Sequence, residues 1–281
     1  MSAFRQSWND RIEIGEPASA VYRFDPELPK PCVHPLATPL GHLLSGFEMS
    51  DHVWHRGLWF TIKFINGTNF WEEQAPFGVQ KSVSDPTCVV LDRDRVRVQH
   101  FTQWESEATG VAIDERRQIT FAPGVIDWSC ELRAKADLTL DRTPYTTWGG
   151  YGGLTLRGAP DWTDTTIRLD DGVERERTLG EPSRWLAIDG VAHRGLDAPA
   201  PAGVVILDHS DNPRFPTPWY ASNRADTYGE GWANFVNAAL LWDEPLTVEP
   251  HAPLTLRYRV LVHDGAWGAD RIADEYGRWT T

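Results

Sequence analysis

The 281-residue sequence lacks several features that would place it in a familiar class. Its three cysteines, Cys32, Cys88 and Cys130, are far apart and include no Cys-x-x-Cys pair, so neither a zinc knuckle nor a disulfide framework is indicated. Cys130 alternates with polar neighbours, and we expect a buried free thiol there. Basic residues number 27 against 40 acidic ones, and the net charge of −13 argues against a nucleic-acid partner.

Long apolar runs and common catalytic signatures are also missing. No stretch approaches the roughly 20 apolar residues that span a membrane, and the opening residues MSAFRQSWNDRIEIG contain no apolar signal-peptide core. We therefore expect a cytoplasmic protein with no membrane partner. Gly-x-Ser-x-Gly and His-Glu-x-x-His are both absent from the sequence, so neither a nucleophile elbow nor a zincin site is indicated.

Tryptophan, in contrast, is abundant, with 14 residues. Tryptophan packs well in β-sheet cores, and it also offers a large rigid face with one N–H donor for stacking on sugar rings. We expect most of these residues in the core. The excess favours a ligand that has flat apolar faces and polar edges.

Apolar residues recur at every second position in three long segments, residues 58–64, 126–134 and 254–263. This period is typical of half-buried strands in an antiparallel sheet. Shorter strands are predicted at 20–24, 87–91, 95–100, 118–121, 154–157, 165–169 and 204–207, and one helix at 268–279. Residues 196–203 are interpreted as a surface loop. With no repeat and no linker, the sequence predicts one all-β domain over residues 1–281, an antiparallel β-sandwich with one C-terminal helix.

Three segments interrupt the alternation with polar and aromatic residues, and the first is DHVWHRGLW at 51–59. His52 and His55 are candidates for proton transfer, for binding hydroxyls or for binding a metal. Residues three apart in an extended strand face opposite sides, so joint binding would need a turn here. The alternative is that both are loop histidines bound to backbone carbonyls. His34, in an earlier loop, is a candidate to join them, and Arg56 follows directly.

The second segment is WGGYGGLTLR at 148–157, where four glycines surround Tyr151. Glycine permits positive φ and a close approach of backbone to a ligand. The segment matches neither a P-loop nor a dinucleotide-binding fingerprint. A bulged strand is the alternative interpretation.

The third segment, residues 208–220, is a loop that three prolines stiffen. A rigid loop costs little entropy to order on a ligand. The alternative is a structural loop whose polar groups bind only its own backbone. Its candidate binding residues are His209, Asn212, Arg214, Trp219 and Tyr220.

Glu72 and Glu73 follow Asn69-Phe70-Trp71 and are either a source of a catalytic base or a solvated acidic turn. The candidates overall are histidines, arginines and carboxylates. Such groups suit proton transfer better than nucleophilic catalysis.

These segments, in this order, resemble the bacterial PmoA-like family, a family of unknown function. The resemblance runs from about Cys32 to Gly265 and rests on these motifs: His34-Pro35, Asp51-His52, His55–Trp59, Asn69–Trp71, Tyr151–Leu154 with Arg157, Asp208-His209, Asn212–Arg214, Pro216–Tyr220, Arg257–Arg259 and His263–Gly265. Val53 and Trp54 stand where family members often carry a proline and a middle histidine, so no role of that histidine carries over. The family's genes commonly lie beside sugar oxidoreductases, which implies sugar catabolism. Its methane-oxygenase label does not fit a chain without a membrane span.

The leading hypothesis is an enzyme that acts on a sugar or keto-sugar by proton transfer, as in epimerisation, elimination or glycoside cleavage. The catalytic candidates are His52, His55, His209, Arg56 and Arg214, with an arginine stabilising an enolate oxygen. The substrate-binding candidates are His34, Trp71, Glu73, Tyr151, Arg157, Asn212, Trp219, Tyr220 and Arg257. A galactose-mutarotase-like super-sandwich would suit this chemistry by fold analogy.

Two alternatives remain open. One is a non-catalytic carbohydrate-binding or accessory protein, in which the same residues only hold hydroxyls. The other is a metal-dependent enzyme, with zinc or manganese on His34, His52, His55 or His209. No other cofactor is expected, the expected partner is a small carbohydrate, and the sequence does not indicate an oligomeric state.

Overall fold

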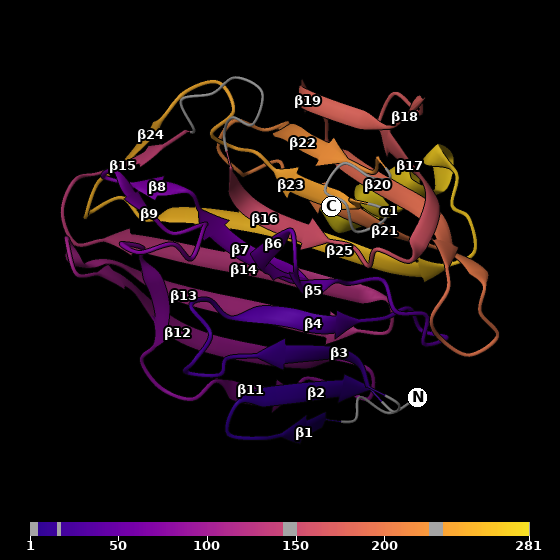
Figure 1. Ribbon diagram of the computed structural model, residues 1–281, viewed down its shortest axis with the longest axis horizontal. Helices are drawn as coiled ribbons and strands as arrows, with labels where there is room; N and C mark the ends of the chain where they lie inside the picture. The colour runs from indigo at the N-terminus through magenta and orange to yellow at the C-terminus, as the bar shows by residue number, and fades with distance from the viewer. Residues whose placement is uncertain (1–4, 16–17, 143–150, 225–232, 281) are drawn as a thin grey trace.

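The computed structural model describes residues 5–15, 18–142, 151–224 and 233–280. Over these residues the chain forms two large antiparallel sheets that pack face to face, with one helix at the C-terminal end (Figure 1). The predicted class, an all-β antiparallel sandwich with one C-terminal helix, is confirmed.

The first sheet is nine-stranded in the described part of the chain and forms the front layer in Figure 1. In order across the sheet its strands are β1 (Arg5–Ser7), β2 (Arg11–Gly15), β3 (Ala18–Arg23), β4 (Cys32–Leu36), β7 (Leu58–Ile62), β16 (Gly152–Arg157), β23 (Phe235–Ala238), β22 (Pro218–Ser222) and β19 (Arg177–Pro182).

The second sheet, behind the first in Figure 1, contains ten strands over the same described ranges. In order these are β10 (Val79–Ser82), β12 (Val96–Ser106), β13 (Gly110–Ala122), β14 (Val125–Ala134), β25 (Leu254–Asp264), β21 (Ala200–Asp208), β20 (Trp185–Ala192), β17 (Trp162–Leu169) and β18 (Glu174–Arg175), with β11 (Thr87–Val90) also pairing with β12.

The remaining elements are short and lie at the margins of the sandwich. A small sheet has the order β24 (Leu246–Val248), β15 (Leu138–Asp141), β8 (Phe64–Ile65) and β9 (Thr68–Asn69). A separate hairpin joins β5 (Phe47–Met49) to β6 (His52–Arg56), and the helix is α1 (Ala269–Thr280).

The main core lies between the two sheets and follows from the period of two. On β14, Trp128 and Cys130 point into it, and Phe60 of β7 meets it from the opposite sheet. Removing this apolar surface from water is the main force that holds the layers together. Cys130 is a buried free thiol, as predicted.

Both outer faces of the sandwich carry additional apolar clusters. Helix α1 buries Ile272 and Tyr276 against the outer face of the second sheet, where Val205 and Leu207 of β21 point. On the outer face of the first sheet, Trp59, Tyr220 and Phe235 form a third cluster. Strand β7 is covered on both faces, so all of its residues are buried and exposed residues do not alternate with buried ones.

The long strands at 126–134 and 254–263 and the helix at 268–279 are confirmed within two residues. Other details of the sequence interpretation are wrong. His34 lies in β4, and Trp219 and Tyr220 lie in β22, where loops were predicted. Residues 200–203 belong to β21 and not to a loop, because they pair with β20 and β25. Residues 58–64 form no single strand, because β7 ends at Ile62 and Phe64 enters the small sheet through β8. Among the described residues, no helix is long and apolar enough to cross a membrane.

Candidate active site

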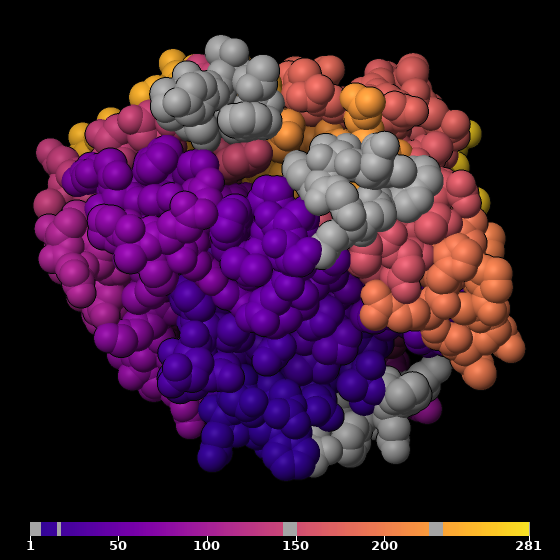
Figure 2. All heavy atoms as spheres, viewed as in Figure 1, coloured from indigo at the N-terminus to yellow at the C-terminus, as the bar shows by residue number. Residues whose placement is uncertain are grey.

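A cavity of about 260 Å³ opens on the outer face of the nine-stranded sheet. Figure 2 shows this face of the molecule, where the segment around residues 50–70 (purple) lies near the centre. The lining residues come from strands β6 and β23, from the turn after β9, and from the single residues that follow β7 and precede β16. These are His52, Trp54, His55, Lys63, Trp71, Glu72, Tyr151 and Phe235.

An irregularity in the β5–β6 hairpin brings His52 and His55 together. Phe47 pairs with Arg56 and Met49 pairs with His52, so three residues of β6 lie between these partners where β5 has one. The two extra residues form a bulge, which turns side chains that would otherwise alternate towards one side. As a result, the His52 and His55 rings stack with their centroids 4.6 Å apart. The predicted loop is therefore a bulged strand, and the bulge supplies the turn that joint action of the two histidines requires.

The ring of His52 is oriented by a carboxylate. Its Nδ1 lies 2.9 Å from Oδ2 of Asp51, and Arg157 donates to the same carboxylate from Nη2 at 3.0 Å. Because the carboxylate only accepts, the Nδ1 atom of His52 carries a proton, and in the neutral imidazole Nε2 is then the basic nitrogen. This carboxylate–imidazole pair has the form of a general base and its orienting group.

His55 has a different electrostatic character. Arg157 donates from Nη1 to Nδ1 of His55 at 3.1 Å, so that nitrogen is an acceptor and Nε2 carries the proton. Burial, followed by the neighbouring Arg157 guanidinium, holds the pKa of His55 well below its ordinary value. His55 is therefore a neutral hydrogen-bond donor, whereas His52 is an acceptor.

Aromatic rings form the apolar part of the lining. Trp71 is 2% exposed, and its ring stacks on Tyr151 with centroids 4.7 Å apart. Trp54 is only half-buried and stands edge-on to His52 at 5.2 Å. Tyr151 covers one face of Trp71, so Trp54 is the better candidate for stacking on a ligand ring.

The glycines around Tyr151 have a structural reason. Gly153 has φ of 121°, and a Cβ there would lie 2.3 Å from the carbonyl oxygen of Ala238. Glycine thus allows β16 and β23 to approach closely beneath the pocket. Residues 148–150 of the same predicted segment lie outside the described residues.

Lys63 and Glu72 supply an ion pair in the lining. The Nζ of Lys63 bonds to Oε1 of Glu72, and Asn69 donates to the other carboxylate oxygen at 2.7 Å. Lys63 also lies 5.3 Å from the centre of the Tyr151 ring. The carboxylate of Glu72 is therefore fixed in place and is not a freely solvated group.

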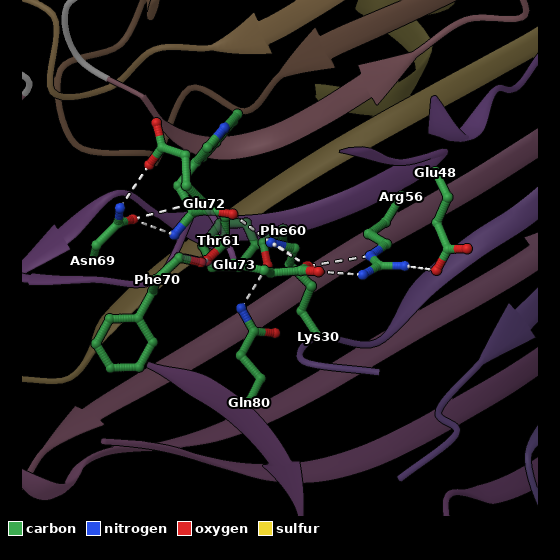
Figure 3. A network of polar contacts seen from close by, with 11 residues as sticks. Lys30, Glu48, Arg56, Phe60, Thr61, Asn69, Phe70, Glu72, Glu73 and Gln80 are labelled. Atoms are coloured by element: carbon green, nitrogen blue, oxygen red, sulfur yellow. Dashed lines mark hydrogen bonds and ion pairs between the residues drawn. The ribbon is translucent and has the colours of Figure 1, made fainter. Parts of the chain in front are cut away.

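Glu73 points away from Glu72 into a separate network (Figure 3). It pairs with Arg56 and, at 3.1 Å, with Nζ of Lys30, which is itself buried. Arg56 also pairs with Glu48. Arg56 and Glu73 thus support the pocket from outside its lining and do not reach into the cavity.

The third predicted segment does not reach the pocket. His209 packs edge-on against Trp279 of α1, with centroids 5.0 Å apart, and Arg257 pairs with Asp211 at 2.8 Å. Asn212 is buried and donates to Asp208 at 2.7 Å and to the Arg257 carbonyl. These contacts are those of a structural loop, the alternative interpretation of this segment.

Two further residues of the third segment are also structural. Arg214 donates to the carbonyl of Leu240 at 2.8 Å and to those of Glu244 and Pro245. The indole N–H of Trp219 donates to the Ser183 carbonyl at 2.9 Å, inside the core. Tyr220 alone approaches the site, since its ring lies edge-on to Tyr151 at 5.5 Å.

His34 lies apart from the cavity lining. Its Nδ1 is 2.8 Å from Oγ of Ser45, and its ring stacks on Phe47. Burial lowers its pKa to about 4. Of the four histidines proposed as metal ligands, the structure therefore brings together His52 and His55. Within the described ranges, no group of three or more His, Cys, Asp or Glu side chains is arranged to hold a metal ion.

The sequence motifs thus named five residues of the lining, His52, His55, Trp71, Glu72 and Tyr151, and Arg157 directly behind it. They missed Trp54, Lys63 and Phe235 as lining residues and Asp51 as the partner of His52. Lys63 had a detectable signal, because the alternation in residues 58–64 places it on the face opposite Phe60 and Ile62. Phe235 had none, because it looks like any other core aromatic.

The third segment also carries a pH-dependent contribution to stability. Burial raises the pKa of Asp208 from 3.8 to about 7, although Asn212 and the Thr217 amide donate to its carboxylate. The folded state therefore holds the Asp208 proton more tightly than the unfolded state. The resulting contribution to the free energy of unfolding is lost as pH rises from about 4 to about 7. Urea unfolding across this range should show that loss in the wild-type protein, and Asp208→Asn should flatten it. An equal slope in both proteins would contradict the assignment.

Comparisons with solved structures give distant likenesses. A putative aldose 1-epimerase from Klebsiella pneumoniae aligns over 96% of this chain and 83% of its own, with 7% identity and a TM-score of 0.49. The putative mutarotase YeaD from Salmonella typhimurium aligns over 93% of both chains, with 13% identity and a TM-score of 0.40. Each score is below 0.5, so neither likeness bears on function.

A third structure, the GH36 alpha-galactosidase AgaA from Geobacillus stearothermophilus, aligns over 81% of this chain with 10% identity and a TM-score of 0.38. This chain spans 29% of that enzyme. No curated protein matches the sequence. Residues 11–277 match the family of unknown function DUF6807, and the chain belongs to that family.

Proposed function

We propose that the protein is an enzyme that acts on a sugar or keto-sugar by proton transfer, with His52 as the general base. The observation that carries the proposal is the Asp51–His52 pair in the lining of an aromatic pocket. A pocket with aromatic walls and a few fixed polar groups suits a ring with apolar faces and hydroxyl edges. The resemblance to the PmoA-like family points to the same class of substrate and stays a prediction.

The two histidines have different roles in the proposed proton transfer. A ketone acidifies the neighbouring C–H bond, and Nε2 of His52 takes that proton while the electron pair moves onto the carbonyl oxygen. The neutral Nε2–H of His55 is suited to donate to the resulting enolate oxygen. Return of the proton to either face gives exchange or epimerisation, whereas loss of a substituent on the next carbon gives elimination.

The test is incubation of the wild-type protein in heavy water with a panel of glycosides and their 3-keto derivatives. Proton NMR would detect deuterium at the carbon beside the carbonyl, and mass spectrometry would detect products. Exchange or product formation supports the proposal. Saturable binding without exchange would instead indicate a carbohydrate-binding protein, and the absence of both would overturn the assignment to sugars.

A further inference from the structure

We infer that this pocket takes an uncharged sugar, and that Glu72 is the residue that excludes carboxylated and phosphorylated sugars. The inference rests on the proposed function and narrows its substrate class. It is carried by the pairing of every charged side chain in and directly behind the lining.

The charges at the site cancel. Arg157 lies 3.0 Å from Asp51, and Lys63 pairs with Glu72. Arg56 pairs with both Glu48 and Glu73, and the second of these also holds Lys30 at 3.1 Å. Four cations therefore stand against four carboxylates: Lys30, Arg56, Lys63 and Arg157 against Glu48, Asp51, Glu72 and Glu73.

The described lining residues include no arginine and no lysine besides Lys63. The stretches 1–4, 16–17, 143–150, 225–232 and 281 contain no lysine, arginine or histidine. His55 lines the pocket as a neutral imidazole, because Arg157 donates to it. An anion that enters would thus lose hydration without meeting an unpaired positive charge, and burying a charge without a partner is costly.

Glu72 is the residue on which this selectivity depends. Lys63 carries the ammonium group in the described lining, and the carboxylate that pairs with it there is Glu72. Asn69 donates from its amide nitrogen to the Glu72 carboxylate, and its Oδ1 accepts the backbone N–H of Glu72. Glu72 is therefore held in position beside Lys63, and removing its charge would leave an ammonium group facing the cavity.

The experiment is calorimetric titration with three matched ligands: methyl glucoside, methyl glucuronide and methyl glucoside 6-phosphate, each also as its 3-keto derivative. The wild-type protein should bind the uncharged member of each set most tightly. In Glu72→Gln, the affinity for the two anions should rise about tenfold relative to the neutral sugar, because one unpaired charge then acts at close range. The matched control is Glu131→Gln, which frees the exposed Arg133 on the outer face of the other sheet and should leave selectivity unchanged.

Failure of the inference and failure of the proposed function give different results. Wild-type protein that binds the glucuronide or the phosphate as tightly as the glucoside overturns the inference and leaves the sugar assignment standing. If none of the ligands binds, both are overturned. If Glu72→Gln does not fold, as judged by thermal unfolding, the wild-type ranking alone still decides. An unchanged ranking in folded Glu72→Gln would refute the role of Glu72.

Discussion

Replacing His52 by glutamine is expected to slow deuterium exchange into a bound keto-sugar by about 10²–10⁴-fold, the usual contribution of a positioned general base. Glutamine keeps a polar side chain of similar reach but has no basic nitrogen. The dissociation constant for the sugar should change little, because the aromatic walls remain. Exchange followed by NMR and binding followed by calorimetry would separate the two effects.

His209 provides the matched control for this experiment. It is a histidine from the same predicted set, yet it packs against Trp279 beneath α1. His209→Gln should exchange at the wild-type rate. If His52→Gln retained full exchange activity, or if both variants lost it equally, His52 would not be the base.

Removing the charge of Glu115 should destabilise the folded protein by about 3–5 kcal/mol, the typical cost of breaking a buried ion pair from one side. Glu115 and Arg117 lie two residues apart on β13, and neither side chain is exposed to solvent. Arg117 donates to Glu115 at 2.7 and 2.9 Å, and Trp104 and Thr102 also donate to the carboxylate. Glu115→Gln would leave the guanidinium charge unpaired inside the sandwich. Chemical denaturation would measure the loss.

Two comparisons make this result specific. Glu131→Gln, on the solvent side of β14, removes an exposed pair and should cost no more than about 1 kcal/mol. The double replacement Glu115→Leu with Arg117→Met should cost less than Glu115→Gln alone, because no charge is left unpaired. A loss below about 1 kcal/mol for Glu115→Gln would show that the pair does not matter for folding.

The sequence predicted the strands whose two faces differ. In β14 and β25 one face meets the core and the other meets solvent, so the alternation is visible in the residues themselves. Strand β21 begins earlier than predicted because residues 200–203 pair with β20 and with β25, which is distant in the sequence. The bulge in β6 left no mark in the pattern, since nothing in DHVWHRG indicates which residues pair across the hairpin.

Local pattern therefore determined the class of fold, the C-terminal helix and the candidate histidines of the first segment. Only the tertiary structure decided which polar segments meet. Strand β7 pairs with β16, and β16 pairs with β23, so residues near positions 55, 151 and 235 line one cavity, while the loop at 208–217 lies with α1 on the opposite sheet. The physical reason is that the side-chain period specifies the face of a strand but not its neighbour. Backbone hydrogen bonds are alike for any pair of strands, and long-range packing selects the order.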